Sequence, residues 1–225
     1  MTAPLIFTGI PLSPRVSTPL DLEVAEHQTV ALLGEEDSGL GALGGYALGL
    51  EQPATGSVRV FGTVIADLPE RQRLAFRHRV GYLPAGDGLL QNLSLRDNVA
   101  LPLRFGSDAS DREIEGRVNV LLAAVRLTSA GGARPNRAND EERRRAALAR
   151  AVAFDPALLI LEQPFDRLSP RAGAELLELA RGGETAQGAR RTILITGQEL
   201  PPGLQRRMDH IYRLTRAGVL QPEPV

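Results

Sequence analysis

One segment has the residue spacing of a phosphate-binding loop but lacks the side chains that bind phosphate. An apolar run from Thr29 to Leu33 predicts a strand, and after it come Gly34, Glu35, Glu36, Asp37, Ser38, Gly39, Leu40 and Gly41. Two glycines with four residues between them are typical of a strand-to-helix loop whose amides hold phosphate, and such loops continue with Lys and then Ser or Thr. Leu40 and Gly41 stand there instead, and all 26 basic residues of the chain are arginines.

The same loop carries three consecutive acids, Glu35, Glu36 and Asp37. Like charges about 4 Å apart repel by roughly 1 kcal/mol in water and about 4 kcal/mol near a protein surface, so these carboxylates oppose a polyanion. A second interpretation needs no ligand, because acids just before a helix satisfy its free amides and its dipole. We favour this second interpretation.

The composition of the chain limits the classes of protein to which it can belong. The chain has 225 residues, 43% of them hydrophobic, a net charge of −1 and no cysteine. This length suits one large α/β domain, and the charge gives no general attraction to nucleic acid. The triplet Arg143 to Arg145 predicts a solvated helix face, without a nucleic-acid partner. No run of about 18 apolar residues is present, so we expect an intracellular chain without a membrane span.

Predicted strands and helices alternate along the chain. Strands are expected at 20–24, 29–33, 56–62, 80–84, 157–161 and 192–196, with a closing hairpin at 211–220. Apolar residues at helical spacing indicate a helix at 111–127, a charged helix-like sequence indicates another at 69–79, and further helices are expected at 140–153 and 170–182. This alternation predicts a mainly parallel sheet covered by helices.

Three further stretches resemble the nucleotide-binding subunits of ABC transporters. Residues 146–164 are similar to that family's A-x-A-R-A-L helix, x-D-P turn, apolar strand and D-E-P ending, and residues 49–56 and 89–103 also resemble it. The resemblance runs from about residue 20 to 220. It implies a P-loop NTPase-like ABC ATPase fold of the α/β class: a mainly parallel sheet, an antiparallel β part and a helical subdomain. The chain would be a single domain, 1–225, with that subdomain at roughly 86–150.

The resemblance also assigns roles to positions whose residues differ from the family pattern. Leu40 and Gly41 replace the phosphate-binding Lys and the Mg²⁺-binding hydroxyl. Glu162 stands at the Asp that organises Mg²⁺, and is one methylene longer. Gln163 stands at the general base, and an amide cannot accept a proton at neutral pH. The Q-loop glutamine falls near Ala85 and the switch histidine on Gly197.

The family's L-S-G-G-Q signature aligns on Ala138, Asn139, Asp140, Glu141 and Glu142. In the family this segment contacts the γ-phosphate bound by the opposite subunit. Here Asn139 followed three residues later by Glu142 predicts a capping box that satisfies the helix end from within the chain.

These departures predict a degenerate cassette, a pseudo-ATPase with a structural or regulatory role. By the resemblance its cofactors are ATP and Mg²⁺, with binding expected to be weak or absent. Its expected partners are a transmembrane permease subunit and a second cassette, either a copy or a different one, and its location is cytoplasmic on the inner face of the membrane. The alternatives are a divergent but active ATPase of a transporter, possibly of the lipid or lipoprotein type, and a soluble interaction protein.

Overall fold

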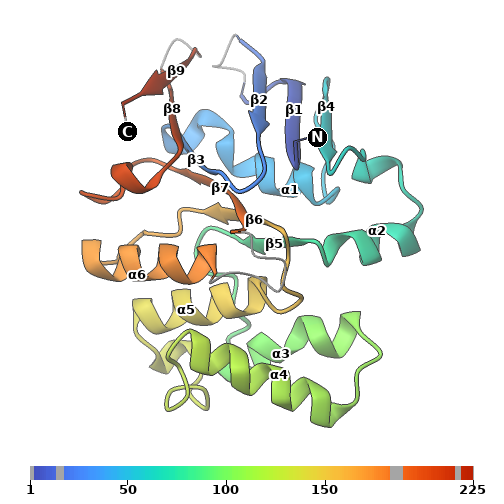
Figure 1. The fold of residues 1–225 in the computed structure, drawn as a ribbon, viewed down its shortest axis with the longest axis vertical. Helices are drawn as coiled ribbons and strands as arrows, with labels where there is room; N and C mark the ends of the chain where they lie inside the picture. The colour runs from blue at the N-terminus through green and yellow to red at the C-terminus, as the bar shows by residue number, and fades with distance from the viewer. Residues whose placement is uncertain (1–2, 14–17, 183–189, 216–218, 225) are drawn as a thin grey trace.

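A six-stranded, mainly parallel sheet runs through the centre of the molecule (Figure 1). The computed structural model describes residues 3–13, 18–182, 190–215 and 219–224. The five parallel strands are followed by one antiparallel edge strand. In spatial order they are β5 (Val80–Leu83), β6 (Leu158–Glu162), β7 (Thr192–Gly197), β3 (Thr29–Leu33), β8 (His210–Leu214) and β9 (Leu220–Glu223).

A second, antiparallel sheet packs against one face of this central sheet. Its strand order is β2 (Leu20–Val24), β1 (Leu5–Ile10) and β4 (Ser57–Val60). Side chains alternate along β3, so Val30 and Leu32 pack with the antiparallel sheet while Ala31 and Leu33 face the helices. Both faces of β3 are therefore buried, as expected for a parallel strand covered on both sides.

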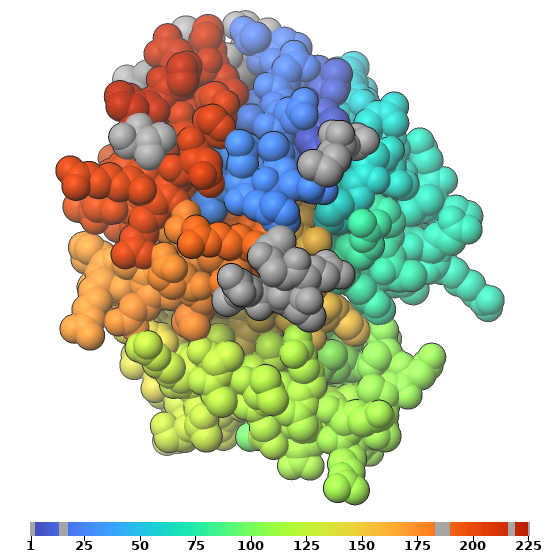
Figure 2. Space-filling model, in the orientation of Figure 1, coloured from blue at the N-terminus to red at the C-terminus, as the bar shows by residue number. Residues whose placement is uncertain are grey.

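Helices cover the other face of the central sheet and extend below it (Figures 1 and 2). The longer ones are α3 (Leu95–Gly106), α4 (Asp111–Ala124), α5 (Asp140–Ala151) and α6 (Pro170–Arg181). Their apolar faces share one buried cluster with β3, β6 and β7. Two shorter helices are α1 (Leu43–Ala47) and α2 (Glu70–Arg77).

The predicted architecture is confirmed. The sheet is mainly parallel, an antiparallel part accompanies it, and helices form a separate layer. The turn of the expected closing hairpin, 216–218, lies outside the described residues, but β8 and β9 pair antiparallel as predicted. No range was predicted for three elements, β1, α1 and α3. Leu95, Val99 and Leu103 have helical spacing in α3, but Pro102 inside the helix obscures that pattern.

The prediction that the arginine triplet lies on a solvated face is wrong for two of its members. Arg144 is 5% exposed and Arg145 is 6% exposed. Arg145 is held by Glu141 at 2.6 Å and Glu175 at 2.8 Å, so its charge is paired. Arg144 is different: its Nη1 is buried and makes no hydrogen bond within the described residues, and burial lowers its pKa. A charge run read along the sequence does not reveal that α5 turns this face inward.

Because Arg145 is ion-paired and Arg144 Nη1 has no partner among the described residues, we expect replacement of the two arginines to have opposite effects on the free energy of unfolding. Arg144→Met should raise the free energy of unfolding by about 1 kcal/mol, because an apolar side chain of similar length needs no partner there. Arg145→Met is the matched control and should lower it by about 1–2 kcal/mol, because Glu141 and the Val125 carbonyl lose their donor, while Glu175 keeps Arg126 and Arg171. Urea unfolding measures both. Equal destabilisation by the two substitutions would contradict this account of Arg144.

Candidate functional site

The carboxyl ends of β3, β6 and β7 bring the predicted site positions together. Gly34, which follows β3, donates its amide to the Gly197 carbonyl at 2.9 Å, and Gln163, which follows β6, donates to the Thr196 carbonyl at 2.7 Å. Parallel neighbours end at the same edge of a sheet, so these loops start side by side. Ala85, beyond β5, joins them in lining one small cavity.

The interior of the loop from Gly34 to Gly41 is filled by its own side chains. Leu40 is 4% exposed and belongs to the core cluster beneath the antiparallel sheet, and Ser38 is 8% exposed. A Cβ added to Gly34 would lie 3.0 Å from Leu40 Cδ1 and 3.1 Å from Ser38 Oγ. Leu40 therefore packs in the core and closes over Gly34, and its uncharged side chain cannot contact phosphate oxygens as a lysine would.

Gly39 is the residue that lets the loop fold in this way. Its φ is +87°, and an added Cβ would lie 1.9 Å from the carbonyl oxygen of Leu12. Only glycine fits both this left-handed conformation and this close approach. The loop is thus packed directly on the segment that follows β1.

Two short turns shape the loop. Residues Glu36–Ser38 and Leu40–Ala42 form 3₁₀ turns, in which Ser38 donates to the Glu35 carbonyl and Ala42 to the Gly39 carbonyl. Side-chain capping by the acidic residues was expected here. That expectation is wrong for Glu35, the N-cap residue of the first turn, which makes no side-chain capping hydrogen bond. Glu36 and Asp37 lie in the first turn, where the helix dipole favours negative charge.

The remaining cavity at this place has a volume of about 60 Å³. Its lining includes Gly34, Ser38, Leu40, Ala85, Glu162, Gln163 and Gly197. A space of this size holds a few water molecules. In this conformation the residues present do not fit a magnesium-bound triphosphate.

Glu162 is turned away from solvent, beneath α1. It is 6% exposed, its Oε2 accepts from the Ala85 amide at 3.3 Å, and its Oε1 has no hydrogen-bond partner among the described residues. Burial raises its pKa, while contact with the Tyr82 hydroxyl and the Ala85 amide opposes that rise. Burial and the same carboxylate raise the pKa of Tyr82 as well. An added Cβ on Gly44 would lie 2.7 Å from Oε1, so α1 covers the carboxylate closely.

Gln163 and Gly197 meet at the mouth of the cavity. Gln163 has a φ of +44°, unusual for a residue with a side chain, and an added Cβ on Gly197 would lie 3.9 Å from its Cα. The amide of Gln163 can position water by hydrogen bonding, but it takes up no proton at neutral pH. Gly197 supplies no side chain.

The segment from Asn139 to Glu142 lies elsewhere, at the start of α5. Asn139 Oδ1 accepts from the Glu142 amide at 2.8 Å, and Glu142 Oε2 accepts from the Asn139 amide at 2.9 Å. The predicted capping box is therefore confirmed. Asp140 binds Arg143 and Glu141 binds Arg145, so the acids of this turn are paired with cations of the next one. None of the four residues lines the cavity at the strand ends.

Comparison with known proteins places this geometry in a family. Residues 17–166 match the family described as ABC transporter. The chain belongs to the ABC transporter family. It is 32% identical over 196 residues to the lipoprotein-releasing system ATP-binding protein LolD of Chromohalobacter salexigens, covering 87% of this chain and 81% of that protein. It is 28% identical over 204 residues to the methionine import ATP-binding protein MetN 2 of Paraburkholderia xenovorans, of which it spans about half, 52%.

A solved ABC cassette shares the same fold. The dimeric structure of MJ0796, a bacterial ABC transporter cassette, superimposes with a TM-score of 0.83 over 97% of each chain. The sequences are 21% identical, so this likeness concerns the fold alone. The ABC ATPase fold predicted from the sequence is thereby confirmed.

Several contributors to this site were not recognised from the sequence. Tyr82 covers Glu162 from β5, and Ser38 helps to fill the loop. Arg150 of α5 donates to the carbonyls of Gly88 at 2.7 Å and Asp87 at 2.9 Å, which fastens the segment after Ala85 to the helix layer. Of these residues, only Arg150 could have been recognised from the sequence, because it belongs to the family-like stretch 146–164.

The buried carboxyl of Glu162 predicts a pH-dependent loss of stability. Because its pKa is raised in the folded protein, its stabilising contribution is complete below the ordinary carboxyl pKa of 4.5 and is lost as pH rises through the raised value. Glu162→Gln cannot ionise, so it should be more stable than the wild type at pH 7 and show little difference near pH 4.

Chemical unfolding at a series of pH values measures this effect. Glu23→Gln, an exposed carboxylate on β2, is the control for the same chemical change and should follow the wild type. If Glu162→Gln and the wild type keep a constant difference across that pH range, the buried carboxyl does not titrate as argued.

Proposed function

We propose that this chain is a pseudo-ATPase: a degenerate cassette with a structural or regulatory role in an ABC transport complex. The observation that carries the proposal is the filled loop, in which Leu40 packs in the core at the position of the phosphate-binding lysine. Gln163 in place of the base and the self-capped start of α5 support it. Phosphoryl transfer depends on positioned cations and donors, and this site supplies few of them.

In this proposal the whole chain, 1–225, acts as one nucleotide-binding-type domain with a helical subdomain at roughly 86–150. It lies on the cytoplasmic side of the membrane beside a transmembrane permease subunit, paired with a second cassette. No helix in the described ranges is long and apolar enough to cross a bilayer. The similarity to LolD favours a system of the lipoprotein-handling kind.

Nucleotide assays test the loss of ATPase function. Purified protein with Mg²⁺ and labelled ATP should show no binding at micromolar concentration and no hydrolysis above background. The physical reason is that phosphate entry requires Leu40 to leave the core, in a loop that also carries three acids.

Gln163→Ala distinguishes the divergent-ATPase alternative from contamination. If Gln163 positions the attacking water of an active enzyme, this substitution should lower the measured hydrolysis at least tenfold. Hydrolysis that is clear in the wild type and lost in Gln163→Ala would refute the pseudo-ATPase proposal. A trace that both proteins share belongs to a contaminant.

Co-purification tests the proposed membrane partner. Phe105 at the end of α3 is 85% exposed, an unusual exposure for an aromatic side chain and a candidate anchor on a permease. Tagged wild-type protein expressed in its native host should retain an integral membrane subunit, and Phe105→Asp should reduce its recovery about tenfold. Val120→Asp, on exposed α4, is the matched control and should retain the subunit. Recovery of no membrane protein would favour the soluble interaction protein instead.

A further inference from the structure

Helix α2 lies on the outside of the molecule. None of its residues is buried, and Figure 2 shows this part of the chain, in teal, projecting from the right edge. A surface helix is ordinarily held in a fold by an apolar face that packs on the core. Helix α2 lacks such a buried face, so other contacts must hold it and most of its surface faces solvent.

Two arginines attach α2 to the rest of the protein. Arg77 Nε donates to the Leu48 carbonyl at 2.9 Å and its Nη2 donates to the Gly49 carbonyl at 3.3 Å, which ties the helix to the end of α1. Just after the helix, the Arg79 guanidinium lies 4.0 Å from the centre of the Phe61 ring. Carbonyl groups and aromatic rings carry no net charge, so both cations stay unneutralised.

The helix and the two residues after it form a strongly basic segment. Residues 70–79 contain four arginines and one glutamate, a net charge of +3 with His78 neutral, whereas the whole chain has a net charge of −1. None of these arginines forms an ion pair with a described residue, and Arg71 and Arg73 make no hydrogen bond there either. Their guanidinium groups keep donors for the oxygens of a phosphate or carboxylate.

Two exposed leucines lie among these cations. Leu74 is 53% exposed, and at 3.6 residues per turn it lies between Arg71 on one side of the helix and Arg73 on the other. Leu50 is 59% exposed and directly follows Gly49, whose carbonyl Arg77 holds. Apolar side chains beside arginines are typical of surfaces that bind at a membrane interface, where arginine reaches the headgroups and the apolar side chain enters below them.

The end of α2 also contacts the end of α3. A Cβ added to Gly106 would lie 2.9 Å from Nε2 of His78, the residue that directly follows α2. Gly106 is the chain neighbour of Phe105, the exposed side chain that is the candidate anchor on a permease. The basic segment therefore borders the part of the molecule that the proposed function places against a membrane subunit.

We propose that the exposed face of α2, together with Leu50, docks on anionic phospholipid headgroups beside the permease. Arg71 and Arg73 donate to phosphate oxygens, and Leu50 and Leu74 enter the boundary between headgroups and acyl chains. An acidic peptide offers similar oxygens, but peptides are bound in grooves or along sheet edges. Helix α2 projects from the surface and fits a flat bilayer better (Figure 2). The inference rests on the proposed function and specifies how its membrane location is reached.

Sedimentation with lipid vesicles tests the proposal. Vesicles of equal parts phosphatidylcholine and phosphatidylglycerol should carry the wild-type protein into the pellet. Vesicles of phosphatidylcholine alone should not, because they have no net charge for the arginines to contact. The bound fraction should also fall as the salt concentration rises, since salt screens this attraction.

Substitutions locate the contact on the protein. Arg71→Gln combined with Arg73→Gln should weaken binding to the anionic vesicles about 25-fold, about fivefold for each charge removed. Arg137→Gln combined with Arg206→Gln removes the same charge from exposed positions outside α2 and should bind like the wild type. Equal losses in the two double variants, or equal binding to the two kinds of vesicle, would overturn the proposal. Binding of polyglutamate without binding of anionic vesicles would also overturn it, in favour of an acidic peptide.

The vesicles contain no permease, so this test can fail separately from the proposed function. A protein that binds no anionic vesicles but still recovers an integral membrane subunit overturns only the lipid contact. A protein that binds these vesicles through α2 and recovers no such subunit supports the lipid contact and contradicts the proposed pairing with a permease.

Discussion

The burial of Leu40 is the contact on which the state of this site depends. Its side chain packs with the core beneath the antiparallel sheet and closes on Gly34 from within the loop. Burial of a leucine stabilises a fold by about 1.5–3 kcal/mol, so opening the loop to a phosphate would cost a comparable amount before any ligand contact forms. In this chain the closed loop is therefore part of the hydrophobic core.

Several polar groups around the site are likewise bonded to other groups of the chain. The Ser38 amide donates to the Glu35 carbonyl within a 3₁₀ turn, and the start of α5 is capped by Asn139 and Glu142. Asp87 is held in a left-handed conformation between Gly86 and Gly88, which share that conformation, while Arg150 binds the carbonyls of Asp87 and Gly88. These donors and acceptors stabilise the chain itself, because a buried polar group without a partner is costly.

The sequence predicted the fold well and the site only in part. Alternating apolar strands and helices led to the parallel sheet, and the spacing of Asn139 and Glu142 led to the capping box, since both depend on neighbours along the chain. The inward direction of Leu40 and the burial of Arg144 and Arg145 depend on contacts between distant segments, such as Gly39 with Leu12, which periodicity does not report. The acids of the loop show the same limit: their composition suits capping, but Glu35, the acidic N-cap residue, makes no side-chain capping hydrogen bond.

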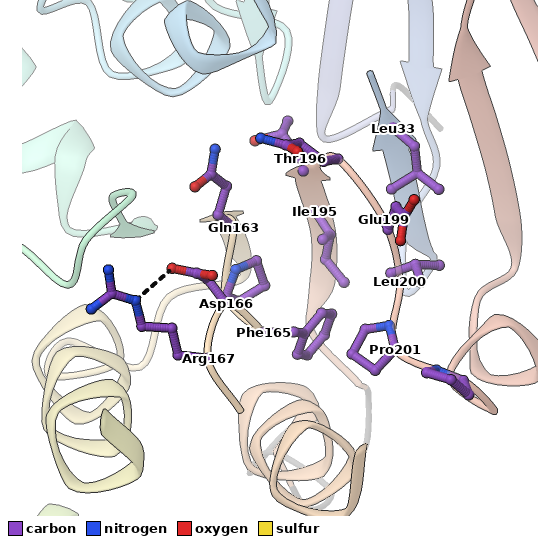
Figure 3. Close-up of a pocket in the computed structure, with 14 residues that line it drawn as sticks. Leu33, Gln163, Phe165, Asp166, Arg167, Ile195, Thr196, Glu199, Leu200 and Pro201 are labelled. Carbon is purple, nitrogen blue, oxygen red and sulfur yellow. Dashed lines mark ion pairs between the residues drawn. The ribbon is translucent and has the colours of Figure 1, made fainter. Parts of the chain in front are cut away.

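The loop from Gly34 to Gly41 is filled by its own side chains, but a second cavity remains at the carboxyl ends of the strands (Figure 3). The two cavities share Gln163, Thr196, Gly197 and Gln198, yet one measures about 60 Å³ and the other about 360 Å³. Gly197 lines both cavities, and a Cβ there would meet only the Cα of Gln163, at 3.9 Å. Neither a close contact nor a positive φ therefore requires glycine at the end of β7, and the missing side chain changes the chemistry of the site without being needed for packing.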